Sequence, residues 1–281
     1  MKIQYYGTGA GAGIPEIFCS CRVCNDARER RGKNIRTRSQ AVIDDRLSIE
    51  FPVDTFLHTV YGGLDMRKIR HVLITHNHHD HFLPQDVLSR PVGYDEPVCF
   101  YSGERSIKGL KKMVDALEEA YRSGTRIRTC NFRVECKTLQ MYEPVAILDY
   151  EVIPLRARHA EDLDGLNFII RSGEKHILWA HDTGLFHTVV WEYLKQSEIA
   201  FDFVSLDCTL KRGVQITKSH MDLDGCRQTA ERLRKQGNLK EHAIIALSHI
   251  GHLVERTHDE LEAEAAEYGM IVAYDGMVME I

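Results

Sequence analysis

The amino-acid sequence predicts one compact α/β domain that spans residues 1–281. Short runs rich in β-branched and aromatic residues alternate with amphipathic helical runs along the chain. No linker, low-complexity run or internal repeat divides these elements. Four apolar runs end in histidine or aspartate, namely "VLITHNHHDH", "ILWAHDT", "FVSLDC" and "IIALSHIGH". Buried strands that end in such residues predict a chemical site along one edge of a sheet.

The expected strands and helices follow from hydrophobic periodicity. A glycine loop at 7–13 follows the first strand, and a helix of about twenty residues follows the strand at 97–101. Strands are expected at 3–7, 40–45, 47–54, 70–75, 97–101, 167–172, 175–182, 201–207, 242–249 and 271–281, with several more inside 127–157. Further helices are expected at 185–196, 222–237 and 257–269, the last opened by a capping box of Thr257 and Glu260.

Composition narrows the possible functions. A formal net charge of −5 argues against a protein whose main task is to coat nucleic acid or an anionic membrane. No apolar run is long enough for a signal segment or a membrane span, so we expect a cytoplasmic protein. The chain has eight cysteines, which in a cytoplasmic protein favour metal binding over disulfide bonds.

The stretch "THNHHDHF" carries the strongest chemical signal. Its H-x-H-x-D-H pattern places His76, His78, Asp80 and His81 directly after an apolar strand. A turn can direct alternate residues to one side, so that His76 and His78 share one metal ion while Asp80 and His81 reach a second. Imidazole and carboxylate ligands suit zinc, manganese or iron. A solvated polar turn is the alternative interpretation, and His79 is expected to be a spectator.

This motif resembles that of the metallo-β-lactamase-fold hydrolases. The resemblance implies an αβ/βα four-layer sandwich that binds two divalent metal ions at the edges of its sheets. It also implies three later ligands, which "RARHAED", "LWAHDTG" and "ALSHIGH" supply in the expected order. One metal ion would be held by His76, His78 and His159, the other by Asp80, His81 and His249, and both by a bridging Asp182.

Two residues near these ligands have less certain roles. His181 adjoins Asp182 on a strand, so its side chain should point to the opposite side and have a structural role. Asp54 ends an early strand, where it resembles a residue that orients a ligand histidine. The alternative for Asp54 is a helix N-cap, and the sequence does not decide between the two.

The stretch "FCSCRVCN" places Cys19, Cys21 and Cys24 in a C-x-C-x-x-C pattern. After a glycine loop, this pattern resembles two branches of the superfamily, the phosphoribosyl 1,2-cyclic phosphate phosphodiesterases of the carbon–phosphorus lyase pathway and the pyrroloquinoline quinone biosynthesis B proteins. The first resemblance implies that His252 completes a closed structural zinc site. A redox centre is less favoured, because the spacing is not a simple C-x-x-C beside a thioredoxin-like unit. A dinucleotide fingerprint is also less favoured, because Pro15 interrupts the pattern after the glycine loop.

The intact set of metal ligands favours the phosphodiesterase branch. The segment "VSLDCTLKRGVQITKSHMDLD" resembles part of that branch, which implies that His220 contacts the phosphate or protonates the leaving oxygen. Asp207 would orient His220 or the substrate, and the implied catalytic set is Asp80, Asp207 and His220. The alternative for His220 is a residue at the start of a helix with no catalytic role.

The sequence therefore predicts a dinuclear metal-dependent phosphodiesterase that hydrolyses a small cyclic phosphate or nucleotide-like diester by attack of metal-bound hydroxide. The alternatives are an RNA-processing endonuclease, a lactonase or thioesterase, and a non-hydrolytic binding protein of the quinone-biosynthesis type. A small phosphodiester is the expected partner, nucleic acid is less favoured, no membrane contact is expected, and the relatives suggest a homodimer. The segment 103–136, with Arg122, Arg126 and Arg128, is either a substrate arm or a solvated helix and turn.

Overall fold

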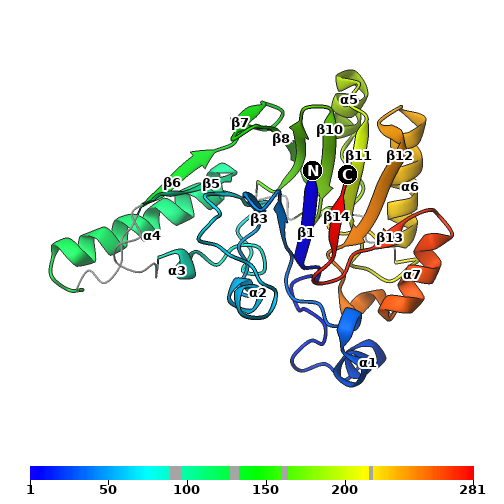
Figure 1. Ribbon diagram of the computed structural model, residues 1–281, viewed down its shortest axis with the longest axis horizontal. Helices are drawn as coiled ribbons and strands as arrows, with labels where there is room; N and C mark the ends of the chain where they lie inside the picture. Colours follow the sequence, from blue (N-terminus) through cyan, green and yellow to red (C-terminus); the bar gives the residue numbers. More distant parts are fainter. Residues whose placement is uncertain (89–95, 127–132, 160–163, 215–217) are drawn as a thin grey trace.

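The computed structural model describes residues 1–88, 96–126, 133–159, 164–214 and 218–281, in which two sheets of seven strands pack face to face (Figure 1). The first sheet has the order β14 (Val278–Glu280), β1 (Lys2–Gly7), β2 (Gln40–Ile43), β3 (Leu47–Ile49), β4 (His71–Leu73), β5 (Val98–Ser102) and β6 (Val134–Thr138). The second has the order β13 (Ile271–Val272), β12 (Leu239–Ser248), β11 (Phe201–Asp207), β10 (Lys175–Ala180), β9 (Leu166–Ser172), β8 (Tyr150–Arg156) and β7 (Val145–Ile147).

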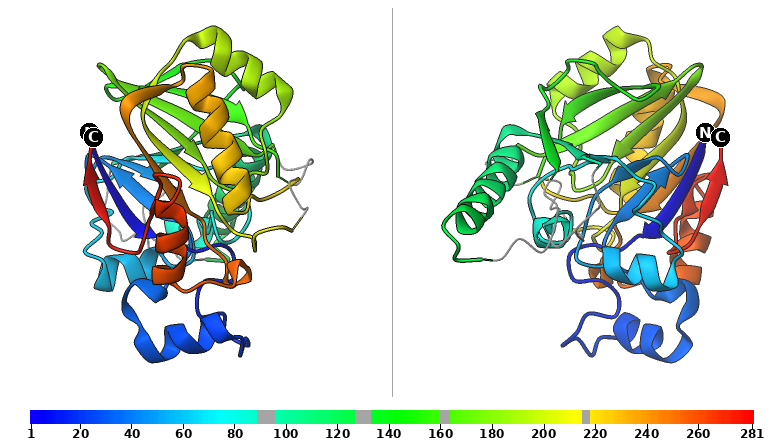
Figure 2. Two further views of the ribbon diagram at one scale, coloured as in Figure 1. Left: turned by 90° about the vertical axis from the view of Figure 1, so that its right-hand side faces the viewer. Right: turned by 60° about the vertical axis from the view of Figure 1, so that its left-hand side comes forward.

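Helices cover the outer faces of both sheets, which confirms the expected αβ/βα sandwich (Figure 2). A hydrophobic cluster fills the space between the sheets, where the ring of Tyr5 stacks on that of Trp179 with 5.4 Å between their centroids. A second cluster packs the second sheet against α5 (Thr188–Ser197), α6 (Leu223–Lys235) and α7 (His258–Ala266). A third packs the first sheet against α4 (Glu104–Arg122). None of the described helices is long and apolar enough to span a membrane.

The strand directions bring four strand ends of the second sheet to one edge. β10, β11 and β12 are parallel, and β8 runs the same way because two antiparallel pairings separate it from β10. His159, Asp182, Asp207 and His249 end or follow these four strands. The loop after β4 of the first sheet brings its histidines to the same edge, as the sequence pattern predicted.

The longer periodic elements were predicted correctly, and three short helices were missed. These helices are α1 (Arg22–Arg30), α2 (Thr55–Tyr61) and the single turn α3 (Pro84–Val87). The outward face of α2 is apolar, with the side chains of Phe56, Leu57, Val60 and Tyr61 exposed, so its sequence shows no alternation of polar and apolar faces. Two short 3-10 turns, η1 (Gly32–Asn34) and η2 (His252–Val254), were also not predicted. Residues 127–132 of the expected strand region lie outside the described part of the chain.

The glycine loop after β1 packs closely against neighbouring backbone. A Cβ atom on Gly7 would collide with the carbonyl oxygen of Arg38, and one on Gly9 would lie 2.8 Å from the carbonyl oxygen of Thr37. A Cβ on Gly11 would lie 3.1 Å from a carboxylate oxygen of Asp80. These glycines therefore allow close chain packing beside the histidine cluster, and the next helix, α1, begins only at Arg22 and not directly at the loop as a dinucleotide-binding turn would require.

We predict that Gly7→Ala lowers the free energy of unfolding by about 1–3 kcal/mol or more, because the added methyl group has no space. Gly109→Ala is the matched control. Gly109 lies within α4 with no atom close to its missing side chain, so alanine there should raise stability by about 0.5–1 kcal/mol. Urea unfolding of both variants tests the prediction, and equal stability of Gly7→Ala and wild type would contradict it.

Candidate metal centres

The loop after β4 holds its histidines in a tight turn fixed by backbone hydrogen bonds. The carbonyl oxygen of His78 accepts hydrogen bonds from the N–H groups of His81 and Phe82, at 3.0 and 2.9 Å. The carbonyl oxygen of His81 accepts another from Phe51, at 2.9 Å. These bonds tie the turn to the chain that follows β3, and His79 projects outward from it, as expected of a spectator.

Four of the predicted ligands form a first cluster at this edge. The Nε2 atom of His76 lies 2.8 Å from Nδ1 of His78 and 3.2 Å from Oδ2 of Asp182. The Nε2 atom of His159 lies 3.4 Å from Nδ1 of His78. All four ligand atoms lie within 4.8 Å of one another, which is the spacing that a single cation requires.

A second cluster adjoins the first and shares Asp182 with it. The Nε2 atom of His81 lies 2.8 Å from Oδ2 of Asp182 and 3.2 Å from Oδ2 of Asp80. The Nε2 atom of His249 lies 3.5 Å from Oδ1 of Asp182. The structure thus groups the seven residues as the resemblance implied, with three ligands on each side of one carboxylate.

Buried atoms at this centre fit divalent cations. His81 Nε2, His249 Nε2 and Asp182 Oδ1 are buried and lie 2.8–3.5 Å from other ligand atoms, but none has a partner in hydrogen-bonding geometry in the described part of the chain. Leaving such atoms unsatisfied is costly, and a cation between them would remove the cost. The donor set of imidazole and carboxylate is also the one that zinc, manganese and iron accept.

The protonation of the site suits cation binding. Burial would raise the pKa of the Asp182 carboxyl, but the imidazoles of His249 and His81 hold it well below its usual range. Burial lowers the pKa of His76 to about 3, so this imidazole is neutral and its lone pair is available. Burial also acts to lower the pKa of His81, but Glu50, Asp182 and Asp80 raise it well above its usual range. A cation would replace the proton on His81.

Glu50 orients a ligand, a role that the sequence analysis did not assign to it. Its buried carboxylate lies 3.1 Å from Nδ1 of His81 and accepts a hydrogen bond from the hydroxyl of Thr75, at 2.6 Å. The hypothesis that Asp54 orients a ligand histidine is wrong. The carboxylate of Asp54 instead pairs with Arg38 at 3.2 Å, and it makes no side-chain cap to α2 either. Glu50, four residues earlier in the same segment, has the role that we considered for Asp54.

Asp207 and Thr209 hold the opposite side of the centre. Nδ1 of His249 lies 3.0 Å from the hydroxyl of Thr209 and 3.2 Å from Oδ2 of Asp207. The same Asp207 oxygen lies 2.9 Å from Nδ1 of His220, a partly exposed residue beside both clusters. Burial opposes protonation of His220, but Asp207 and Asp182 raise its pKa to about 9. Asp207 therefore has the position expected of a residue that orients His220.

His181 lies on the other side of its strand from Asp182, as predicted. Its buried ring is 3.2 Å from the hydroxyl of Ser39 and 2.7 Å from that of Ser205. Burial holds the pKa of this imidazole well below its usual range, so the ring is neutral and hydrogen-bonded on both nitrogens. These contacts give His181 a structural role between the two sheets.

Three residues of the centre have left-handed backbones, which are uncommon outside glycine. Their φ angles are 70° at Glu50, 50° at Asp182 and 52° at His249. Such conformations persist where the surrounding structure determines them, and they concentrate at functional sites. Glu50 and His249 directly follow β3 and β12, and Asp182 is the second residue after β10, so the turn in the backbone redirects each side chain toward the centre.

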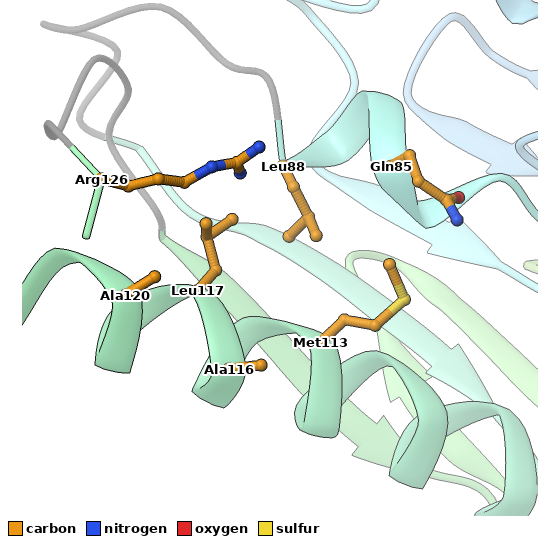
Figure 3. A pocket seen from close by; sticks show the side chains of 7 residues that line it. All are labelled: Gln85, Leu88, Met113, Ala116, Leu117, Ala120 and Arg126. Carbon is orange, nitrogen blue, oxygen red and sulfur yellow. The ribbon is translucent and has the colours of Figure 1, made fainter.

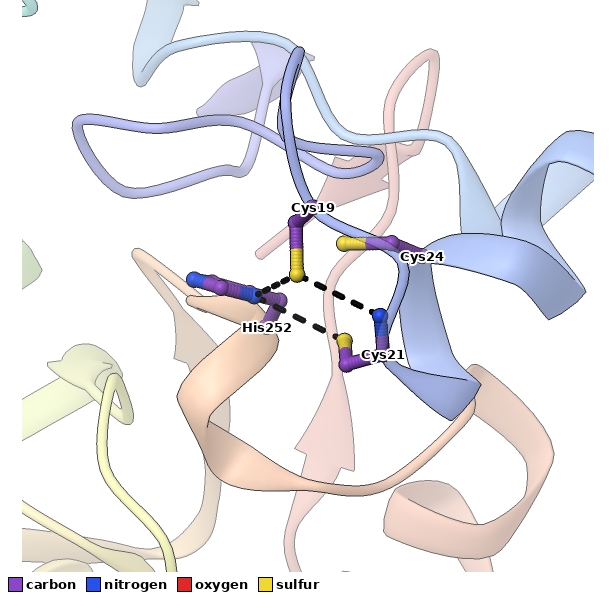
Figure 4. A group of neighbouring side chains, drawn as sticks. All are labelled: Cys19, Cys21, Cys24 and His252. Carbon is purple, nitrogen blue, oxygen red and sulfur yellow. Dashed lines mark hydrogen bonds between the residues drawn. The ribbon is translucent and has the colours of Figure 1, made fainter.

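The predicted cysteines Cys19, Cys21 and Cys24 lie together with His252, three residues after the ligand His249 (Figure 4). Nδ1 of His252 lies 3.3 Å from Sγ of Cys19 and 3.6 Å from Sγ of Cys21, and Cys24 completes the group. Partial burial opposes ionisation of Cys21, but hydrogen bonds with the Cys24 backbone and His252 lower its pKa to about 6. Glu16 lies 3.4 Å from Nε2 of His252 and so directs its Nδ1 to the sulfurs.

The segment 103–136, which we considered as a substrate arm, contains α4. Its residues form part of the wall of an open cavity. A cavity of about 510 Å³ lies between α3 and α4, lined mainly by apolar side chains such as Leu88, Met113 and Leu117, with Arg126 at one end (Figure 3). Arg122 instead forms an exposed pair with Glu119 on α4, as a solvated helix face would. Arg128 lies outside the described residues.

Comparison with protein families assigns the chain to a superfamily. The model of the beta-lactamase superfamily domain matches residues 54–244, which contain most of the histidine and aspartate ligands. The chain is a member of the metallo-β-lactamase-fold hydrolases. The match starts after the cysteine cluster and ends before His249 and His252.

Two solved structures share the metallo-β-lactamase fold over the whole chain. A new diphosphatase from the PhnP family has a TM-score of 0.74 at 23% identity, and the alignment covers 100% of this chain and 97% of that one. Zn²⁺-bound PqqB from Methylobacterium extorquens has a TM-score of 0.71 at 17% identity, with 100% of both chains covered. At these identities the likeness shows the fold.

A curated relative is longer than this chain. The octanoyltransferase of Porphyromonas gingivalis is 25% identical over 284 residues, and 96% of this chain takes part in the match. The chain spans about half, 53%, of the length of that relative.

We predict that Glu50→Gln weakens metal binding about 10–100-fold, because His81 loses the carboxylate that fixes its orientation. Asp54→Asn is the control, since Asp54 contacts Arg38 and no ligand. Titration against a metal chelator measures both variants. Equal losses of affinity in the two variants would show that Glu50 has no special role.

We predict that Cys21→Ser lowers the amount of bound metal per chain and the midpoint of thermal unfolding by several degrees. Cys136→Ser is the control, because Cys136 lies on β6 outside the cluster. Metal analysis and calorimetry measure the two effects. An unchanged midpoint together with full metal content in Cys21→Ser would argue against a metal at these cysteines.

Proposed function

We propose that this protein is a dinuclear metal-dependent phosphodiesterase that hydrolyses a small cyclic phosphate or nucleotide-like diester. One observation supports this proposal best. The carboxylate of Asp182 lies close to both sets of three ligands, so that the two sets share it. Two divalent cations at such a centre, when bound, would lower the pKa of water and neutralise charge on a phosphodiester. Seven ligands around two sites leave coordination positions for a substrate.

The chain's own residues supply the second part of the proposed reaction. His220 stands beside both clusters with Nδ1 held by Asp207, so its Nε2 is the atom available to a substrate. Its raised pKa keeps a proton on the ring near neutral pH. In the proposed reaction His220 binds the phosphate or gives this proton to the leaving oxygen, while Asp207 fixes the ring and stabilises its positive charge.

The cysteine cluster has a structural role in this proposal. Three thiolates and an imidazole form a closed four-ligand set that suits zinc and leaves no position for a substrate. The zinc would fix the loop before α1 to η2, only three residues after the ligand His249. The diphosphatase likeness also supports a phosphorus-containing substrate, since that protein is named a diphosphatase.

A second candidate is hydrolysis of an acyl ester or thioester. The relative from Porphyromonas gingivalis is named an octanoyltransferase, which associates a protein of related sequence with acyl transfer. Activated water at a dinuclear centre can also attack a carbonyl carbon. A panel of cyclic phosphates, linear phosphodiesters and octanoyl thioesters, assayed with manganese and with zinc, separates the two candidates.

We predict that His76→Ala and Asp182→Asn reduce phosphodiester hydrolysis to the background rate, because each removes a ligand from the first cluster. His79→Ala is the matched control from the same turn, since this side chain is exposed and outside both clusters. Circular dichroism should show a native fold in all three. Full activity in Asp182→Asn would contradict the proposed dinuclear reaction.

We predict that His220→Ala lowers kcat about 10²–10⁴-fold while the metal content of the protein stays unchanged. Asp207→Asn should lower kcat less, because the imidazole remains but loses its anionic partner. Steady-state kinetics with metal analysis on the same samples tests this. If the His220→Ala enzyme keeps the wild-type kcat, His220 takes no part in the reaction.

A further inference from the structure

A single buried hydroxyl group, that of Thr75, lies between ligands of the two metal clusters. Its oxygen is 3.0 Å from Nδ1 of His76, a ligand of the first cluster, and 3.4 Å from Nδ1 of His81, a ligand of the second. The hydroxyl group also donates a hydrogen bond to Oε1 of Glu50, at 2.6 Å. Thr75 and Glu50 are each 1% exposed, so these contacts lie in a region of low dielectric, where hydrogen bonds are strong.

The direction of these hydrogen bonds determines which nitrogen of His76 carries the proton. A hydroxyl group has one proton, and Thr75 gives it to Glu50, so toward His76 the hydroxyl oxygen is an acceptor. Nδ1 of His76 must therefore donate. Its lone pair is then on Nε2, the atom that lies 3.2 Å from Asp182 in the first cluster.

The same chain of hydrogen bonds reaches His81. Nδ1 of His81 lies 3.1 Å from Oε1 of Glu50, the oxygen that accepts the proton of Thr75. Because a carboxylate accepts, Nδ1 of His81 donates to it. Nε2 of His81 lies 2.8 Å from Asp182. In both imidazoles, therefore, the nitrogen that faces Asp182 is the one that a cation would use.

The backbone of Thr75 is held independently of its hydroxyl group. Its carbonyl oxygen accepts a hydrogen bond from the N–H of Leu166, the first residue of β9, at 3.0 Å. Its own N–H donates to the carboxylate of Glu50, at 3.3 Å. A substitution that removes only the hydroxyl group keeps both backbone contacts, so it tests the hydroxyl group itself.

From this geometry we infer that Thr75 is a positioning residue for both metal sites, and that the hydrogen-bonded chain through Thr75 and Glu50 couples them. One hydroxyl group orients a ligand in each cluster, so its loss weakens both sites. The hydroxyl group of Thr209, by contrast, makes both of its contacts in the described chain with His249 of the second cluster. The inference rests on the proposed function only for the presence of two cations.

Titration of the metal-depleted protein with Mn²⁺, followed by electron paramagnetic resonance of the unbound ion, tests the inference. Thiolates are poor ligands for Mn²⁺, so the titration counts ions at the histidine clusters and not at the cysteines. Thr75→Val, which removes the hydroxyl group and keeps the branched shape, should raise the dissociation constants of both sites about ten-fold or more. Thr75→Ser, which keeps the hydroxyl group, should restore most of this loss.

Two other threonines provide matched controls. Thr209→Val should raise only one of the two dissociation constants, because its hydroxyl group contacts one ligand. Thr229→Val should change neither, because this buried hydroxyl group donates to the sulfur of Met221, which is not a metal ligand. Thermal unfolding of the metal-depleted proteins shows which variants fold, and Thr75→Ala replaces Thr75→Val if valine prevents folding.

A double-mutant cycle of Thr75→Val and Glu50→Gln tests the coupling. If both residues act through one chain, the loss of affinity in the double variant is smaller than the product of the two separate losses. Separate losses that multiply would overturn the chain. Weakening of only one site or of neither site in Thr75→Val, or equal weakening in Thr75→Ser, would overturn the shared role of the hydroxyl group.

Failure of this inference and failure of the proposed function give different results. Two bound Mn²⁺ ions whose affinities depend on Thr75, without hydrolysis of any phosphodiester, would overturn the function and support the inference. Hydrolysis of phosphodiesters together with Mn²⁺ binding that is independent of Thr75 would support the function and overturn the inference. Fewer than two Mn²⁺ ions bound at saturation by the wild type would overturn both.

Discussion

The buried carboxylate of Asp182 is the constraint on which the site depends. It lies within 3.5 Å of imidazole nitrogens from both clusters, and its pKa stays low because those imidazoles favour the anion. Two β-sheets must meet at one edge to place it there, since His76 and His81 come from the first sheet and His249 from the second. The fold thus provides a concentrated set of lone pairs that positive charge would stabilise.

Four of the seven metal ligands could be predicted locally, because the H-x-H-x-D-H spacing places them directly after an apolar run. His159, Asp182 and His249 were assigned through the family resemblance, and the parallel strands β10, β11 and β12 bring two of these strand ends to one edge. The pairing of Cys19, Cys21 and Cys24 with His252 required the family resemblance, because nothing local connects residues about 230 positions apart. The αβ/βα layers also followed from that resemblance.

The supporting residues could not be predicted in the same way. Glu50 acts on His81 through a left-handed backbone at the end of β3, and such a conformation gives glutamate no sequence signature. Asp54 appeared better placed because it ends the run that looked like a strand, but α2 begins one residue later and turns it toward Arg38. Helix α2 was missed because its exposed face is apolar. Its sequence therefore lacks the polar positions that normally mark the outer face of a surface helix.

The most direct test of the central claim is a crystal structure of the metal-loaded protein with anomalous scattering measured at the absorption edges of zinc and manganese. The account predicts two cations about 3.5–4 Å apart, with one oxygen or both oxygens of Asp182 between them, and a separate zinc at the cysteine cluster. A single cation at the histidine clusters, or an Asp182 carboxylate that contacts no metal, would contradict it.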